Sequence, residues 1–131
     1  MELHYKIIGI VLIALAFVHI IFPKYFNWKE ELKPLSLINQ QIMKVHTFFI
    51  ALVVFLIGLL CLTSSNDLIH TELGKKVSLG FGIFWSFRLI IQFFGYSSKL
   101  WKGKKMETIV HIIFSFLWTY LSYIFIKVYL T

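Results

Sequence analysis

The chain has 131 residues, of which 59% are hydrophobic and 18% aromatic, and its formal net charge at pH 7 is +7. Soluble proteins are typically about 45–50% apolar, so this composition excludes an ordinary water-soluble globular domain. The positive charge does not indicate nucleic acid as a partner, because most lysines lie just outside long apolar stretches, where they suit a membrane surface with anionic headgroups.

The first predicted span covers residues 5–22. An apolar run of this length matches the hydrocarbon thickness of a bilayer, about 30 Å, at about 1.5 Å of helix rise per residue. Pro23 is expected to end the helix, because proline cannot continue the hydrogen-bond ladder. No small-residue cleavage pattern follows the run, so we expect a retained span rather than a signal peptide. In the aromatic and lysine-rich connection 23–44, Ser36 is expected to cap a helix that runs into the second span.

The second span is predicted at residues 45–63 and is closed by a polar turn cluster at 63–67, with a polar loop to residue 76. The third span is predicted at 77–96, a basic connector follows, and the fourth span is predicted at 107–130. These apolar runs lack the alternation of membrane β-strands, which favours helices. The predicted fold class is therefore an all-α integral membrane protein, with residues 1–131 forming a single domain of four transmembrane helices in an up-down bundle of two hairpins.

The distribution of lysine predicts the orientation of this bundle. Eight lysines lie in the first and third connections, and four lie on the opposite side. Positive loops generally face the cytoplasm, so both termini are expected outside. We expect an integral protein of the bacterial cytoplasmic (inner) membrane that contacts the lipid bilayer and does not bind nucleic acid.

Five polar side chains are expected within one half of the bilayer. With the midpoint of each span at the bilayer centre, Arg88 lies within roughly 2 Å of the midplane, and His19 and Gln92 lie roughly 7–8 Å toward the cytoplasm. His46 and His111 lie roughly 12 Å toward the cytoplasm. A charge at the bilayer centre costs about 2.5–3.5 kcal/mol on insertion scales, and such residues are usually functional. The sequence therefore predicts a ligand-binding polar pocket lined by His19, His46, Arg88, Gln92 and His111.

Each of these residues also has a purely structural interpretation. His46 and His111 can contact lipid headgroups or make a hydrogen bond between helices. Arg88 can donate to backbone carbonyls and to Gln92, or it can meet an anionic group of a ligand. Both interpretations of each residue remain open from the sequence.

Three uses of the predicted pocket are compatible with the sequence. The first is binding of an anionic, haem- or quinone-like ligand, with His46 and His111 as axial ligands of haem b and Arg88 near a propionate or quinone oxygen. The second is a histidine–metal membrane enzyme that uses His19, His46 and His111 with Glu107. The third is a non-catalytic accessory or assembly subunit of a larger membrane complex, or a homo-oligomer. The sequence identifies neither a catalytic residue nor a cofactor, so it does not establish an enzyme.

Overall fold

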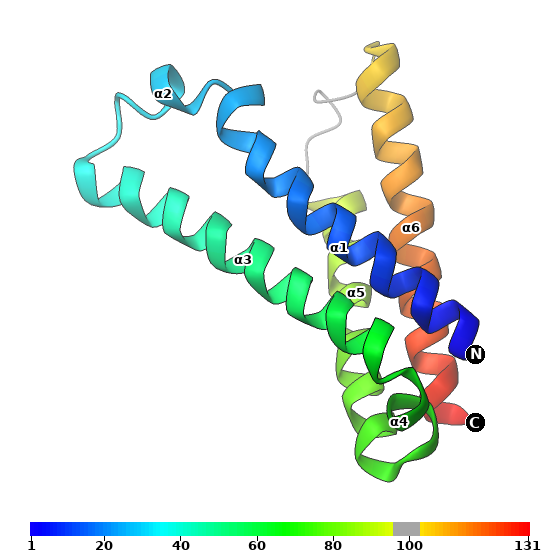
Figure 1. Cartoon of the computed structure of the whole chain (residues 1–131). Helices are drawn as coiled ribbons and strands as arrows, with labels where there is room; N and C mark the ends of the chain where they lie inside the picture. The colour runs from blue at the N-terminus through cyan, green and yellow to red at the C-terminus, as the bar shows by residue number, and fades with distance from the viewer. Residues whose placement is uncertain (96–102) are drawn as a thin grey trace. The chain divides into compact units, whose positions relative to one another are not determined.

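The computed structural model describes residues 1–95 and 103–131 of the chain (Figure 1). These residues form α1 (Glu2–Tyr25), α2 (Trp28–Glu31), α3 (Leu37–Thr63), α4 (Ser65–His70), α5 (Glu72–Phe94) and α6 (Lys105–Leu130), and the described ranges contain no strand. Helices α1, α3, α5 and α6 are long and apolar enough to cross a membrane. The prediction of an all-helical chain with four candidate spans is therefore confirmed.

The end of α1 differs from the prediction, because Pro23 lies inside the helix, which continues to Tyr25. Proline removes the N–H donor that would bond to the carbonyl of residue 19, but only two residues of α1 follow Pro23, so the loss is confined to the last turn. The N–H of Phe26 still donates to the carbonyl of Phe22 at 2.9 Å. The expectation that Pro23 ends the helix was wrong.

Helix α3 begins at Leu37, well before the second predicted span at residue 45. The hydroxyl oxygen of Ser36 accepts a hydrogen bond from the backbone N–H of Asn39 at 3.4 Å, which confirms the predicted N-cap. The short helix α2 occupies part of the connection between α1 and α3.

The polar loop predicted before residue 76 is mostly helical. Helix α4 covers its first part, and α5 already begins at Glu72, so the prediction of a loop was wrong. Thr71 separates the two helices: its hydroxyl oxygen accepts from the N–H of Gly74 at 2.9 Å, and its hydroxyl donates to the carbonyl of Asp67 at 2.6 Å. A Cβ atom at position 74 would collide with the Asp67 carbonyl, so only glycine allows this close approach of α5 to α4.

Part of the third connection lies outside the described residues. This applies to Tyr96, the predicted end of the third span, and to Lys99, Trp101 and Lys102 of the basic connector.

The contacts divide the chain into two compact units, Glu2–Ser65 and Asn66–Thr131, the latter with Met1. In the first unit α1 packs along α3, and in the second α5 packs along α6. Gly9 and Gly58 let the first pair approach closely, because a Cβ on Gly9 would lie 2.6 Å from the carbonyl oxygen of Gly58. Small residues serve the same purpose at helix contacts in membranes.

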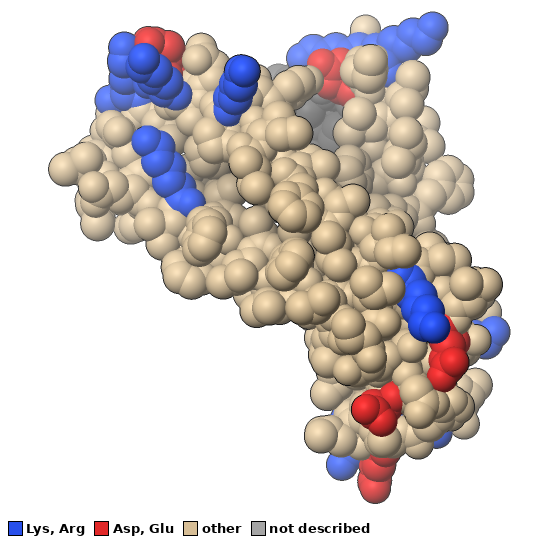
Figure 2. All heavy atoms as spheres, viewed as in Figure 1, with Lys and Arg blue, Asp and Glu red and all other residues tan. Residues whose placement is uncertain are grey.

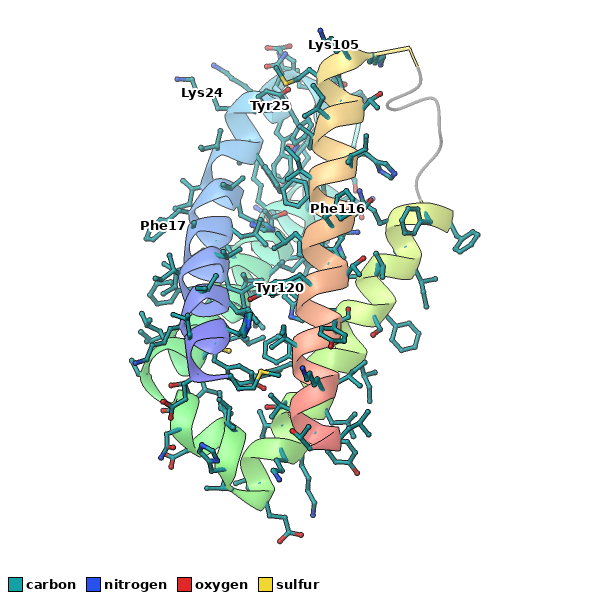
Figure 3. All side chains as sticks on the ribbon, turned by 90° about the vertical axis from the view of Figure 1, so that its right-hand side faces the viewer. Phe17, Lys24, Tyr25, Lys105, Phe116 and Tyr120 are labelled. Carbon is teal, nitrogen blue, oxygen red and sulfur yellow. The ribbon has the colours of Figure 1, made fainter. Side chains whose placement is uncertain are left out.

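The surfaces of both units are apolar along the middle of the helices. On the face shown in Figure 2, charged side chains gather toward helix ends and the stretches between them carry none. Large apolar side chains are exposed there, including Phe17 in the first unit (58%) and Phe116 in the second (72%; Figure 3). Such extensive exposure is unusual in water and compatible with a lipid environment.

Candidate functional site

Three of the five predicted site residues meet between α5 and α6. Arg88 donates from Nη1 to Oε1 of Gln92 at 3.4 Å, and Nε2 of Gln92 lies 2.9 Å from Nδ1 of His111. Arg88 and Gln92 lie one turn apart on α5, which places them on one face. His111 comes from α6, so Gln92 connects the two helices. The Gln92 side chain is buried, with 5% exposed, and Arg88 and His111 are partly buried.

The hydrogen bonds determine the orientation of the Gln92 amide and the tautomer of His111. Nε2 of Gln92 also lies 3.4 Å from the backbone carbonyl oxygen of His111, and a carbonyl oxygen can only accept. The NH₂ group of Gln92 therefore faces α6, and Nδ1 of His111 must accept from it. In the neutral ring, the His111 proton then resides on Nε2. The same His111 carbonyl accepts a second bond from the Ser115 hydroxyl at 2.8 Å.

A stacked pair of tryptophans borders this network. The rings of Trp85 and Trp118 are nearly parallel, with an interplanar angle of 8° and centroids 4.9 Å apart. Cζ of Arg88 lies 5.2 Å from the Trp118 ring centroid, within the range of a cation–π interaction. Both indole N–H groups are buried and have no hydrogen-bond acceptor within the described part of the chain. Buried donors are nearly always paired, so these two indole N–H groups are exceptions, and both could donate to an acceptor that is not part of the described chain.

The α5–α6 site is rich in donors, with the Arg88 guanidinium and the indole N–H groups of Trp85 and Trp118 close to one another in the packing of the two helices. No acidic residue occurs between Glu72 and Glu107, or after Glu107. The two carboxylates at the helix starts are far along the chain from Arg88, so no carboxylate of α5 or α6 lies one or two turns from the guanidinium. Donors of this kind pair well with oxygen atoms that bear full or partial negative charge.

His19 lies at a different place, in a pocket of the first unit formed by α1, α2 and α3. The pocket is open and has a volume of about 650 Å³. His19 donates from Nδ1 to the carbonyl of Leu15 at 2.8 Å, and its ring packs against Phe22 at a centroid distance of 4.8 Å. The hydrogen bond holds the ring against its own helix.

His46 is exposed on α3. Its neighbours Met43, Thr47 and Ile50 line the pocket that contains His19, but His46 does not. The structure thus brings Arg88, Gln92 and His111 together in one unit and leaves His19 and His46 apart in the other. A single pocket of all five residues stays a prediction.

The histidine–metal interpretation finds no supporting geometry within either unit. In residues 1–95 and 103–131, no three His, Cys, Asp or Glu side chains form a group that could hold a metal ion. Glu107 lies at the exposed start of α6, one turn before His111.

Sequence reasoning missed the two tryptophans as members of the site. The signal was present in the spacing, since Trp85, Arg88 and Gln92 lie at i, i+3 and i+7 on α5. On α6, His111 and Trp118 are also seven residues apart. These two faces carry the interaction between the helices.

Comparison with known proteins assigns no function to the chain. No family model matches it, and no curated protein and no solved structure matches it either. A function must therefore be inferred from the side chains and their contacts.

Proposed function

We propose that the protein resides in the bacterial cytoplasmic membrane and binds a small anionic or quinone-like ligand through Arg88, Gln92 and His111. In this proposal, the four long helices form an up-down bundle of two hairpins with both termini outside. The contacts between α1 and α3 support the first hairpin, because the two helices run antiparallel: Gly9 lies near Gly58, and Phe17, later in α1, packs on Phe55, earlier in α3. The lysines concentrated in two connections support the orientation.

The observation that carries the ligand proposal is the donor network of the α5–α6 site. The contacts of the Arg88 guanidinium include Oε1 of Gln92 and the face of Trp118, which are both neutral groups. A cation in a membrane-spanning segment is costly unless a charge, a dipole or water compensates it. A carboxylate, phosphate or quinone oxygen beside Arg88 would accept from the guanidinium and could also accept from the indole N–H groups of Trp85 and Trp118, which have no acceptor within the described part of the chain. Charge-assisted hydrogen bonds of this kind are roughly twice as strong as neutral ones.

The His111 tautomer favours such a ligand over haem b. A histidine ligates iron through a ring nitrogen that carries no proton, and Nδ1 of His111 is already engaged by Gln92. Ligation through Nε2 requires the proton on Nδ1, and the Gln92 amide would then have to rotate. Its oxygen would face the His111 carbonyl, acceptor against acceptor, and would no longer accept from Arg88. A haem that uses His111 would therefore disrupt the network described above.

The tryptophans provide a direct test, because the ligand site contains Trp85 and Trp118. The full chain is purified in detergent after labelling of its four tryptophans with 5-fluorotryptophan, and each ¹⁹F resonance is assigned by single Trp→Phe variants. Decyl phosphate and a short-chain benzoquinone serve as separate probes. We expect at least one of them to shift the Trp85 and Trp118 resonances saturably, and Arg88→Gln to raise its Kd about tenfold or more, as for the loss of a charge-assisted bond.

Lys127→Gln is the matched control for Arg88→Gln. Lys127 is also a cation on this helix pair placed over an aromatic ring, 5.5 Å from the Tyr123 centroid, but it lies in the last turn of α6. Its substitution should leave the Kd unchanged. An equal loss in both variants, or the absence of any saturable shift, contradicts the proposal. A Soret band that disappears in His46→Ala or His111→Ala favours haem instead, and recovery of the chain only with larger subunits favours the accessory role.

A further inference from the structure

We infer that the open pocket of the first unit is a second binding site, and that it takes a primary ammonium group carried on an apolar body. The residues that line the pocket come from the end of α1, from the short helix α2, from the residue that follows each of these two helices, and from the first half of α3. This inference concerns residues 2–65 alone and does not depend on the ligand proposed for α5 and α6.

The polar groups of this pocket are hydrogen-bond acceptors. His19 donates from Nδ1 to the Leu15 carbonyl, so in the neutral ring Nε2 carries a lone pair. The Thr47 hydroxyl donates its proton to the Met43 carbonyl at 2.8 Å, which leaves the Thr47 oxygen as an acceptor. Glu31 adds a carboxylate to the lining. A ligand that matches these three side chains must supply donors.

The negative charge of the pocket comes from Glu31 rather than from its neighbour. Glu30 forms an ion pair with Lys33, with 2.9 Å between Nζ and Oε2. In the described part of the chain, no ion pair engages Glu31, and no lysine or arginine lines the pocket. An anion is therefore disfavoured here and a cation is favoured.

Aromatic side chains form the remaining wall and suit an organic cation. Phe22, Phe26 and Trp28 line the pocket, with the rings of Phe22 and Phe26 5.5 Å apart in an edge-to-face arrangement. Trp28 is only 8% exposed, so its position is well defined by packing. Aromatic faces attract ammonium groups, and the aliphatic part of the lining accommodates an apolar chain. A primary ammonium has N–H donors for acceptors of this kind, and a quaternary ammonium has none.

A primary ammonium group on an apolar body can come from two kinds of molecule, and the experiment distinguishes them. One is the ethanolamine headgroup of a membrane lipid, whose acyl chains supply the apolar body. The other is a free alkylamine. Both present a primary ammonium beside methylene groups, and aromatic residues near a helix end are typical of the headgroup level.

The test follows the ¹⁹F resonance of Trp28 in the fully labelled chain described above. In detergent, decylamine is the probe and decyltrimethylammonium is the quaternary comparison. We expect decylamine to shift the Trp28 resonance saturably and to bind more tightly than the quaternary compound. Glu31→Gln should raise its Kd about fivefold, a moderate effect because the carboxylate is exposed to solvent. Glu30→Gln removes an equal charge from the same helix and should leave the Kd unchanged.

The lipid source is tested in nanodiscs. If nanodiscs containing phosphatidylethanolamine shift the Trp28 resonance relative to phosphatidylcholine nanodiscs, and Glu31→Gln abolishes that shift, the site takes the lipid headgroup. If only decylamine produces the shift, the site takes a free amine. Equal effects of Glu30→Gln and Glu31→Gln, equal affinity for the two ammonium compounds, or no saturable response overturns the inference. Unchanged Trp85 and Trp118 resonances in these variants verify that the protein remains folded.

Discussion

The two helix pairs resemble each other in construction and differ in hydrogen-bonding character. In each, two long apolar helices pack where glycine permits close approach, and polar side chains gather at one place along the pair. Between α5 and α6 these polar groups are mainly donors, and they include the Arg88 guanidinium and the two indole N–H groups. In the pocket beside α1 and α3 they are acceptors, and Glu31 is the one that carries a charge. The ligands proposed for the two pairs therefore carry opposite charge.

The pairs also differ in how far their polar groups contribute to packing. Gln92 is buried and joins α5 to α6 through His111. His19 and Thr47 instead bond to carbonyls of their own helices, and Glu31 is exposed. Substitution of these polar groups should consequently affect both stability and ligand affinity in the second unit, and mainly ligand affinity in the first.

The largest effect is expected from a glycine contact. Gly9→Leu should destabilise the protein by about 3 kcal/mol, because overpacking is most costly where the obstacle is backbone. The new Cβ would meet the Gly58 carbonyl oxygen and the backbone N of Leu62. Gly80→Leu is the control, since nothing lies within 4 Å of a Cβ at that position. Thermal unfolding in detergent measures both, and comparable losses would show that the α1–α3 contact is not the cause.

A smaller loss is expected from the residue that connects α5 and α6. Gln92→Leu should destabilise by about 2 kcal/mol, because it removes the partner of His111 from a buried position. Because the Thr47 hydroxyl bonds to a carbonyl of its own helix, Thr47→Val should cost less. Thermal unfolding of the two variants compares them directly. A larger loss of stability in Thr47→Val would contradict the conclusion that polar groups contribute more to packing in the second unit than in the first.

A carboxylate at position 92 should weaken the binding of an anion at the α5–α6 site. Gln92→Glu places a carboxylate one turn from Arg88, where it forms an internal ion pair. We expect decyl phosphate to bind about tenfold more weakly, since the guanidinium is then neutralised from within. Decylamine binding at Trp28 should not change. Retention of phosphate binding in this variant would show that Arg88 does not supply the affinity.

The smallest effects concern the helix caps, one in each unit. Thr71→Ala should cost about 1 kcal/mol, as is typical for loss of an N-cap side chain. Ser36→Ala should cost about half of that, because the Ser36 bond is longer, at 3.4 Å against 2.9 Å for Thr71. Chemical or thermal denaturation measures the difference, and equal losses would indicate that bond length does not govern these caps.

The sequence by itself determined the four long helices, the Ser36 cap and the shared face of Arg88 and Gln92. Each depends on local spacing, since apolar run length and helical periodicity act over a few turns. Local rules failed at Pro23, where a position in the last turn lets the helix continue. They failed again before residue 76, where Gly74 allows α4 to fold against α5.

Only the tertiary structure decided which polar residues meet. Depth along the spans could not show that His111 contacts Gln92, or that Arg88 lies over the ring of Trp118. Both contacts depend on how α5 and α6 pack, and the predicted pairing of His111 with His46 stays a prediction. Packing also directed His19 and Thr47 toward a pocket whose charge comes from Glu31 in a connection. Periodicity specifies the faces of one helix, whereas the partner of each face depends on where two helices come into close contact, which is a property of the folded pair.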